Sequence, residues 1–276
     1  MNIFLTGSTG FLGSHFLSLA LKSGHHVKAL RRIGSKARLL LTQEPDWIEG
    51  YLDSNWRNQL DDCDVLVHLA ATGVYFNKEN WKTCFDINMT KSLELWKQAV
   101  ESGVKRFIIC GSCFEYGLAA LDYEYIPASA PLLPTNAYSA SKAAATITAI
   151  GMANQFDLKL RVVRPFHIYG EGEAECRFWP SLMKAAHEGK DFYMSGGEQI
   201  RDFIHVGDVA KSILESIYEL DDTAKNISIK NIGTGFPKTL LAFAEEQWSS
   251  LHAKGRLLPG SLPYRPHEMM RYVPQI

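Results

Sequence analysis

Short apolar runs alternate with longer amphipathic segments along the first part of the chain. Asn2–Thr6, His26–Leu30 and Val65–Ala70 have the length of strands, and the last is apolar enough to be buried on both faces. Gly13–Ser23, between the first two runs, carries apolar residues at helical spacing. This alternation indicates βαβ units around a parallel sheet.

The alternation continues as far as Pro165. Trp81–Ser102 and Tyr138–Ala153 are predicted helices, and the predicted strands Arg106–Cys110 and Lys159–Arg164 follow them. A chain of this pattern predicts a doubly wound sheet with helices on both faces.

Beyond Pro165 the pattern breaks into glycine-rich and charged stretches. Only Val206–Leu220, a predicted helix, and Ile229–Ile232, a predicted strand, resume it. We therefore predict an α/β fold, a Rossmann-type doubly wound parallel sheet with a smaller, irregular C-terminal substrate lobe. The expected boundaries are residues 1–165 with 201–235 for the sheet domain, and 166–200 with 236–276 for the lobe.

Composition and charge exclude several classes of protein. Of the 276 residues, 46% are hydrophobic and 21% are charged, as in folded globular proteins. The 29 Lys and Arg residues nearly balance the 30 Asp and Glu residues, so we expect no nucleic-acid partner and no membrane partner. The five scattered cysteines, the lack of a basic leader and the lack of a long apolar run predict a cytoplasmic protein.

Cys110 and Cys113 form a C-x-x-C at the end of a predicted strand. No second pair accompanies them, so small apolar packing is the favoured role and we predict no metal site.

A glycine-rich turn, Gly7–Gly13, joins the first predicted strand to the first predicted helix. Its glycines permit a tight turn, close approach of a pyrophosphate, and close packing of helix on strand, while the helix N-terminus attracts the anion. The alternative is a merely structural turn. The predicted cofactor contacts are Gly7, Thr9, Gly10, Phe11, Leu12 and Gly13.

Two arginines, Arg31 and Arg32, stand where the second strand ends. An NAD site usually offers a carboxylate there to the ribose 2′-hydroxyl, whereas guanidinium groups match a 2′-phosphate. NADP(H) is therefore favoured over NAD(H); the alternative is that both arginines are solvated surface residues.

Tyr138 and Lys142 lie four residues apart, on one face of a predicted helix. A neighbouring positive charge stabilises a phenolate, so this pair suits acid–base chemistry. Ser112, just after a predicted strand, is positioned in the chain to hydrogen-bond a substrate carbonyl.

Several further motifs accompany these residues in a fixed order. Together the series resembles the extended short-chain dehydrogenase/reductases, the NAD-dependent epimerase/dehydratase group that acts on nucleotide sugars, over nearly the whole chain. The motifs are the glycine turn, Asp64–Ala71, Asn88, Gly111–Gly117, Tyr138 with Lys142, Arg164–Gly170, Arg201–Val206, Asp208–Ala210 and Asn231–Gly235.

The resemblance implies a role for each matching residue. Tyr138 would be the acid–base residue, Lys142 would lower its pKa and bind the nicotinamide ribose, and Ser112 would orient the reacting oxygen. Arg201 would contact the substrate's diphosphate, and the protein would form a homodimer. Further cofactor contacts would be Leu69, Ala70, Ala71, Lys142 and Pro165. Substrate contacts would be Asn88, Cys113, His167, Arg201, Arg265 and Glu268. Two alternatives are equally open: Asn88 packs its helix onto the sheet, and Arg265 and Glu268 are surface residues without a substrate role.

The chain departs from the family pattern at informative positions. Cys113 and Phe114 follow the serine where sugar 4,6-dehydratases have Asp-Glu, so an elimination reaction lacks its acid and base and is rejected. Tyr51 stands where a carboxylate often meets adenine, and His167 replaces an Asn. The family usually continues beyond the position of Ile276, so we expect an open substrate lobe.

Three hypotheses follow from the resemblance. The first is an NADPH-dependent reductase of a nucleotide-linked 4-keto(-6-deoxy) sugar for surface polysaccharide synthesis, to which Gly197–Phe203 and Gly111–Gly117 are most similar. The second is a nucleotide-sugar 4-epimerase, which Arg31 and Arg32 count against because such an enzyme retains NAD. The third is a non-catalytic NADP-sensing protein, which the intact Ser112, Tyr138 and Lys142 count against.

Overall fold

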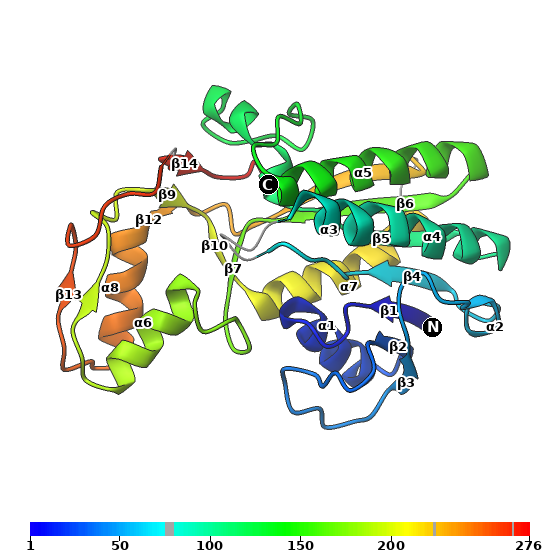
Figure 1. Cartoon of the computed structure of the whole chain (residues 1–276), viewed down its shortest axis with the longest axis horizontal. Coiled ribbons are helices and arrows are strands. Elements are labelled where there is room, and N and C mark those ends of the chain that lie inside the picture. The colour runs from blue at the N-terminus through cyan, green and yellow to red at the C-terminus, as the bar shows by residue number, and fades with distance from the viewer. Residues whose placement is uncertain (75–79, 223–224, 267) are drawn as a thin grey trace.

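The computed structural model describes residues 1–74, 80–222, 225–266 and 268–276, and within them a seven-stranded parallel sheet forms the centre (Figure 1). The connections run from β1 outward to β3 and then reverse to the other side of β1, and ligands of such sheets bind at the strand ends near this reversal. Across the sheet the strands are β11 (Ile227–Ile232), β6 (Lys159–Pro165), β5 (Arg106–Cys110), β4 (Val65–His68), β1 (Asn2–Thr6), β2 (His26–Arg31) and β3 (Asp46–Glu49).

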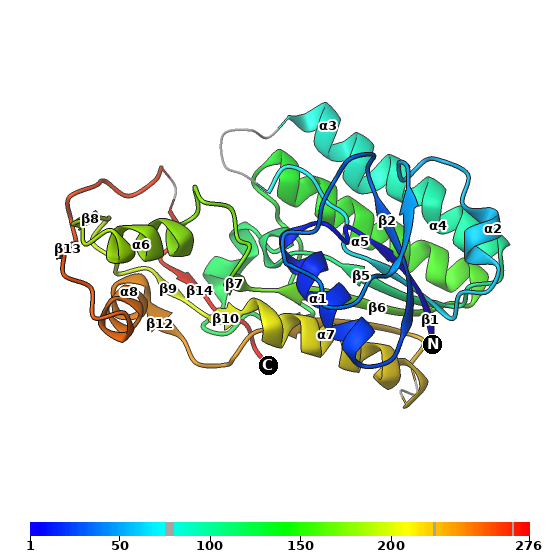
Figure 2. The ribbon, with the colours of Figure 1, turned by 90° about the horizontal axis from the view of Figure 1, so that it is seen from below.

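Helices cover both faces of this sheet (Figure 2). On one face α1 and α7 pack together, and Phe16 and Ile213 join the buried side chains of the strands. On the other face α4 and α5 supply Trp96 and Ala149. The predicted doubly wound fold is confirmed. The helices of this domain are α1 (Phe11–Lys22), α2 (Arg57–Leu60), α3 (Trp81–Phe85), α4 (Ser92–Glu101), α5 (Ala137–Phe156) and α7 (Val206–Asp222).

The helix predicted over Trp81–Ser102 is interrupted by a π-helical turn, η1 (Asp86–Lys91), between α3 and α4. Hydrophobic spacing alone does not reveal such a turn, because it shifts the helix face by a single residue. π turns occur often at functional sites. This one turns Asn88 inward, where it is buried.

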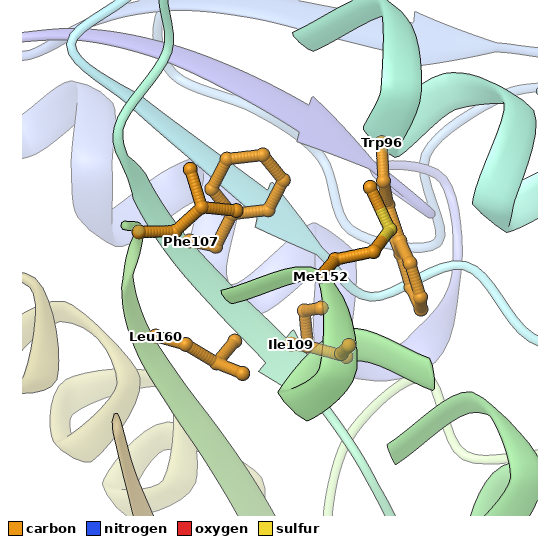
Figure 3. A pocket seen from close by; sticks show the side chains of 7 residues that line it. Trp96, Phe107, Ile109, Met152 and Leu160 are labelled. Carbon is orange, nitrogen blue, oxygen red and sulfur yellow. The ribbon is translucent and has the colours of Figure 1, made fainter. Parts of the chain in front are cut away.

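A small apolar cavity of about 10 Å³ lies between the sheet and the α4–α5 layer (Figure 3). This space is roughly that of one water molecule, and the lining offers no polar partner, so it is a packing defect of the core. The lining residues are Trp96, Phe107, Ile109, Ala149, Met152, Leu158 and Leu160.

A smaller lobe, with α6, α8 and β13, lies at the left of Figure 1. Its core comes from α6 and α8, which pack on each other through Leu182, Ala244 and Trp248. The division into domains at the expected residues stays a prediction. The lobe elements are α6 (Phe178–His187), α8 (Leu240–Ser250) and the short strands β7 (His167–Tyr169), β8 (Phe192–Tyr193), β9 (Ile200–Arg201), β10 (Phe203–His205), β12 (Lys238–Thr239), β13 (Leu257–Leu258) and β14 (Arg271–Tyr272).

The sequence pattern missed one strand of the main sheet, β3. At the sheet edge two of its four residues are half-buried and two are exposed, so they carry no apolar run. Within the described parts of the chain, no helix combines the length and apolarity needed to cross a bilayer.

Candidate active site

The glycine turn between β1 and α1 has a backbone path that only glycine permits. Gly7 has φ +70°, and a Cβ there would lie 2.6 Å from the Ala70 nitrogen. A Cβ on Gly13 would lie 1.9 Å from the Gly7 carbonyl oxygen. The turn, which includes Thr9, Gly10, Phe11 and Leu12, therefore lies directly against Leu69–Ala71, so the structure brings two sets of predicted cofactor residues together at the N-terminus of α1.

A chain of buried hydrogen bonds fixes the end of β4 beside this turn. His68 Nδ1 lies 3.0 Å from Thr6 Oγ1, which accepts the Ala70 N–H at 3.2 Å. Its Nε2 lies 3.0 Å from Ser92 Oγ, which donates to the Ile87 carbonyl. These partners assign the Nε2–H tautomer, because Ser92 then accepts and Thr6 donates.

The imidazole of His68 is therefore held neutral. Burial, together with the positive charge of Lys142, lowers the pKa of His68 to about 3. Sequence reasoning missed this residue, since a histidine at a strand end carries no signal of its own.

At the far end of β2, Arg31 already has a partner. Its Nε and Nη2 lie 3.0 and 2.9 Å from Glu49 Oε1, and its guanidinium stacks 4.6 Å from the Trp47 ring centroid. Arg32 is exposed. Glu49 and Trp47 belong to β3, the strand that the sequence pattern did not predict. A carboxylate therefore does lie at the end of β2, although it comes from the neighbouring strand.

Ser112, Tyr138 and Lys142 meet at the carboxyl end of β5. Ser112 is the N-cap of a short 3₁₀ turn, η2 (Cys113–Glu115), and its hydroxyl accepts the Phe114 N–H at 3.2 Å. Tyr138 lies in the first turn of α5, and its phenol is close enough to the Ser112 side chain for Ser112 to lower its pKa. Lys142, 3% exposed, donates from Nζ to the Cys110 carbonyl.

Burial raises the pKa of the Tyr138 phenol, and the contact with Ser112 is the strongest influence in the opposite direction. The resemblance assigned the lowering of this pKa to Lys142. That role of Lys142 stays a prediction; its ammonium donates to the Cys110 carbonyl.

Asn88 links three elements beside these residues. Its amide accepts the Thr72 N–H at 2.8 Å and donates to the Thr72 carbonyl and to Ser141 Oγ, at 3.0 and 2.9 Å. Ser141 follows Tyr138 on α5, so Asn88 ties η1 to that helix. Its polar atoms are thereby engaged with protein groups rather than turned to a ligand.

The thiols of Cys110 and Cys113 are buried, and burial raises the pKa of Cys110 to about 11 and of Cys113 to about 12. Neutral thiols of this kind neither ligate a metal nor react as nucleophiles at neutral pH. Among the described residues, no group of three or more His, Cys, Asp and Glu side chains is arranged to hold a metal ion.

Aromatic rings surround His167 on the lobe side of Ser112. Its ring lies 6.0 Å from Phe114, 6.1 Å from Phe203 and 6.2 Å from Tyr272, measured between centroids. Burial lowers the pKa of His167 well below its ordinary value, and Arg201 adds to the effect. The Nδ1 atom of this buried imidazole has no hydrogen-bond partner among the described residues.

Arg201 and Glu268, both predicted to contact substrate, form an ion pair of 2.6 Å. Arg201 also donates to the Met269 carbonyl at 2.6 Å and is 8% exposed. It pairs with Tyr272, whose hydroxyl donates to the Cys113 carbonyl at 2.7 Å, so it lies near Ser112 and η2, which together we call the serine turn. Arg265, by contrast, is exposed, and Pro165 ends β6 next to the Cys110 end of β5.

Sequence reasoning also missed Glu173, in the loop between β7 and α6. Its carboxylate lies 3.4 Å from Arg177, and burial raises its pKa to about 7 against the effect of that arginine. No local pattern distinguishes it from a surface glutamate.

A protein-family model described as "NAD dependent epimerase/dehydratase family" matches residues 3–233. The chain is similar to dTDP-6-deoxy-L-talose 4-dehydrogenase (NAD(+)) of Aggregatibacter actinomycetemcomitans, with 24% identity over 275 residues, 98% of each chain.

Two solved structures resemble the whole fold. One is UDP-N-acetylglucosamine 4-epimerase from Methanobrevibacter ruminantium M1 in complex with UDP-N-acetylmuramic acid, with a TM-score of 0.88 and 23% identity over 100% of this chain and 89% of that one. The other is MoeE5 in complex with UDP-glucose and NAD, with a TM-score of 0.82 and 26% identity over 98% of this chain and 88% of that one. These likenesses confirm the predicted architecture.

Proposed function

Because the chain belongs to the NAD-dependent epimerase/dehydratase family, and is therefore an enzyme of nicotinamide-dependent nucleotide-sugar modification, we propose that it reduces a nucleotide-linked 4-keto(-6-deoxy) sugar with NADPH. The product is the 4-hydroxy sugar. The observation that carries this proposal is the meeting of Ser112, Tyr138 and Lys142 at the carboxyl end of β5, with Lys142 on the Cys110 carbonyl.

The proposed chemistry needs a proton for the C4 oxygen as the ketone becomes an alcohol, and the bound dinucleotide supplies the hydride. Tyr138 donates that proton. Its raised pKa favours the neutral phenol, which is the form a reductase requires at the start of each cycle.

Ser112 stabilises the developing negative charge on the same oxygen. Its hydroxyl already accepts the Phe114 N–H, so its own proton is available to donate. Lys142, buried beside the Cys110 carbonyl, contributes a fixed positive charge and a donor for the nicotinamide ribose. Cys113 and Phe114 offer no acid or base, which supports reduction over elimination of water.

The glycine turn fits a dinucleotide, because Gly7 and Gly13 let it pack tightly on itself and on the Leu69–Ala70 backbone at the N-terminus of α1, where a pyrophosphate would bind. We propose that Arg32 selects NADPH by pairing with the 2′-phosphate, with Arg31 in support. The pairing of Arg31 with Glu49 weakens that support, and the named relative and MoeE5 are both associated with NAD. NADP(H) selection therefore rests chiefly on Arg32.

On the substrate side, we propose that Arg201 holds the diphosphate of the nucleotide sugar, oriented by Glu268, with His167 and Cys113 near the sugar. Arg265 completes the proposed substrate residues, and for Asn88 we propose the alternative role, which is to hold η1 against α5. We also propose the lobe of residues 166–200 and 236–276 as the substrate domain, and a homodimer as the working form, which light scattering would test.

A second candidate function is a nucleotide-sugar 4-epimerase, which the similarity to a UDP-N-acetylglucosamine 4-epimerase and the Arg31–Glu49 pair favour. Purified protein incubated with NADPH and a panel of nucleotide 4-keto-6-deoxyhexoses separates the two. A reductase consumes NADPH stoichiometrically and yields the 4-hydroxy sugar. Interconversion of two 4-hydroxy nucleotide sugars without net change at the nicotinamide absorbance band would replace the reductase with the epimerase.

A further inference from the structure

One buried carboxylate, that of Glu115, connects the two elements that carry the site's hydroxyl groups. Its Oε1 accepts the backbone N–H of Ser112 at 2.7 Å. Its Oε2 accepts Thr146 Oγ1 and Arg164 Nε, both at 2.9 Å. Thr146 lies on α5, two turns after Tyr138. The carboxylate therefore bridges the serine turn and α5.

We propose that Glu115 is a positioning residue, which acts through Ser112 by holding the serine turn at a fixed distance from α5. This inference rests on the proposed role of Ser112. It does not depend on whether the reaction is a reduction or an epimerisation, since both need the same serine.

The burial of this ion pair is itself informative. The side chains of Glu115 and Arg164 are 0% and 1% exposed, and burying two charges carries a desolvation cost that apolar residues of similar size would avoid. Burial raises the pKa of Glu115, and the charges of Arg164 and Lys142 oppose it. Since apolar residues would stabilise this part of the core at least as well, the ion pair is better explained by a role in fixing the geometry of its neighbours.

Arg164 is in turn held from two sides. Its Nη1 donates to the Ala128 carbonyl at 3.3 Å, and its guanidinium lies 4.7 Å from the Tyr116 ring centroid. One oxygen of the Glu115 carboxylate is therefore held by Thr146 and Arg164, and the other accepts the Ser112 N–H.

The same turn fixes the direction of the Ser112 proton. The capping box places the Phe114 N–H against the Ser112 oxygen while Glu115 takes the Ser112 N–H. The single hydroxyl proton is left to be donated, either to the Tyr138 oxygen or, when a substrate is bound, to the reacting oxygen. Loss of the Glu115 contact frees the turn to rotate, and with it the donor.

The test compares two double variants that both replace the buried arginine. E115Q/R164M keeps an amide oxygen for the Ser112 N–H, whereas E115L/R164M has a side chain of similar size without an acceptor. Replacing both charged partners avoids leaving one charge unpaired in the core. T146V is the matched control, because it removes a donor to Oε2 and leaves the Ser112 contact in place.

Turnover is measured on the nucleotide sugar that the wild-type protein converts, whichever reaction that proves to be. We expect E115L/R164M to lose about 100-fold in kcat, with cofactor Kd unchanged. E115Q/R164M and T146V should stay within about fivefold of wild type, the scatter ordinary for indirect changes. Equal losses in the Gln and Leu variants would overturn the proposal.

A double-mutant cycle separates positioning from plain stability. The two double variants are also compared after Ser112→Ala is added to each. Their kcat values should then differ by less than about twofold, because the side chain at position 115 acts only through the Ser112 hydroxyl, which is now absent. The pH dependence of the reverse reaction, oxidation of the 4-hydroxy sugar, gives a second readout. Because the Ser112 contact lowers the Tyr138 pKa, its loss in E115L/R164M should move the rise of this rate to higher pH. A loss in the Ser112→Ala background as large as that in the wild type, or an unmoved pH profile, would refute the role.

Failure of the proposed function looks different. If the wild-type protein interconverts 4-hydroxy sugars instead of reducing ketosugars, the proposed reductase function is wrong. The role of Glu115 can still be tested with the same variants, by measuring the rate of that interconversion.

Discussion

The two ends of the proposed cofactor-binding edge are built in opposite ways. Around Ser112 the polar groups are buried and bonded within the protein, with Glu115 on its amide and Lys142 on a neighbouring carbonyl. At the far end of β2, Arg32 is exposed and Arg31 reaches Glu49 near solvent. Acid–base chemistry needs a fixed geometry, whereas cofactor choice needs only a charge of the right sign.

This difference predicts how each end responds to substitution. Changes at the buried end should alter rate or stability strongly, because neighbouring groups lose their partners. Changes at the exposed end should alter cofactor preference alone, because solvent replaces the lost contacts.

The largest effect is expected from Tyr138→Phe at the buried end. Loss of the proposed proton donor should reduce turnover about 10²- to 10⁴-fold while cofactor affinity stays the same. Steady-state rates and a fluorescence titration with NADPH measure both. Tyr218→Phe, which removes only a phenol hydrogen-bonded to His25 on the surface, is the control. Near-normal turnover by Tyr138→Phe would remove the tyrosine from the chemistry.

Acid should destabilise the buried end through His68. Its folded pKa of about 3 lies below the ordinary value of 6.5, so the unfolded chain binds the proton more readily. The stability that neutral His68 provides is complete above pH 6.5 and is lost as the pH falls toward 3. At pH 5 the loss is about 2 kcal/mol from this group alone.

Urea unfolding at pH 7 and pH 5 measures this loss, and His68→Gln is the comparison. The variant should be less stable at pH 7 but less sensitive to acid between pH 6.5 and 5. An acid response identical to that of the wild type would show that other groups cause it.

A smaller effect is expected at the exposed end from Arg32→Ala. If the guanidinium pairs with a 2′-phosphate, NADPH affinity should fall about tenfold, the usual value of a charge-assisted hydrogen bond, and NADH affinity should not change. Equal losses for both cofactors, or none, would contradict the proposed selection of NADPH.

The smallest effect is expected from Glu49→Gln. Releasing Arg31 from its carboxylate should increase the preference for NADPH about threefold, in line with the strength of exposed ion pairs. Titrations with both cofactors at low salt measure the ratio. A change in turnover instead of preference would show that the two ends are not independent.

Local sequence patterns predicted most of the sheet and the meeting of Ser112, Tyr138 and Lys142. The strands β1 and β5 have the predicted bounds, because an apolar run between polar turns marks both ends. The glycine turn was predictable for a similar reason, since the required φ angle and close contacts restrict residue type.

Contacts between distant segments were not predictable in this way. Glu49 meets Arg31 only because a half-exposed edge strand pairs with β2, and Glu115 meets Arg164 across β5 and β6. The lobe was expected to be irregular, but its two-residue strands are too short to leave a periodic pattern. Neither the neutral state of His68 nor the π turn around Asn88 has a local sequence signature.

The strand order also determines when each part of the site is completed as the chain leaves the ribosome. After β4 each new strand, β5, then β6, then β11, pairs with the one made just before it. N-terminal segments fold first during synthesis. The glycine turn has its neighbours once Ala70 has emerged, but the serine turn is braced only after Arg164 arrives. A nascent chain therefore assembles the glycine turn well before Ser112 is held in place.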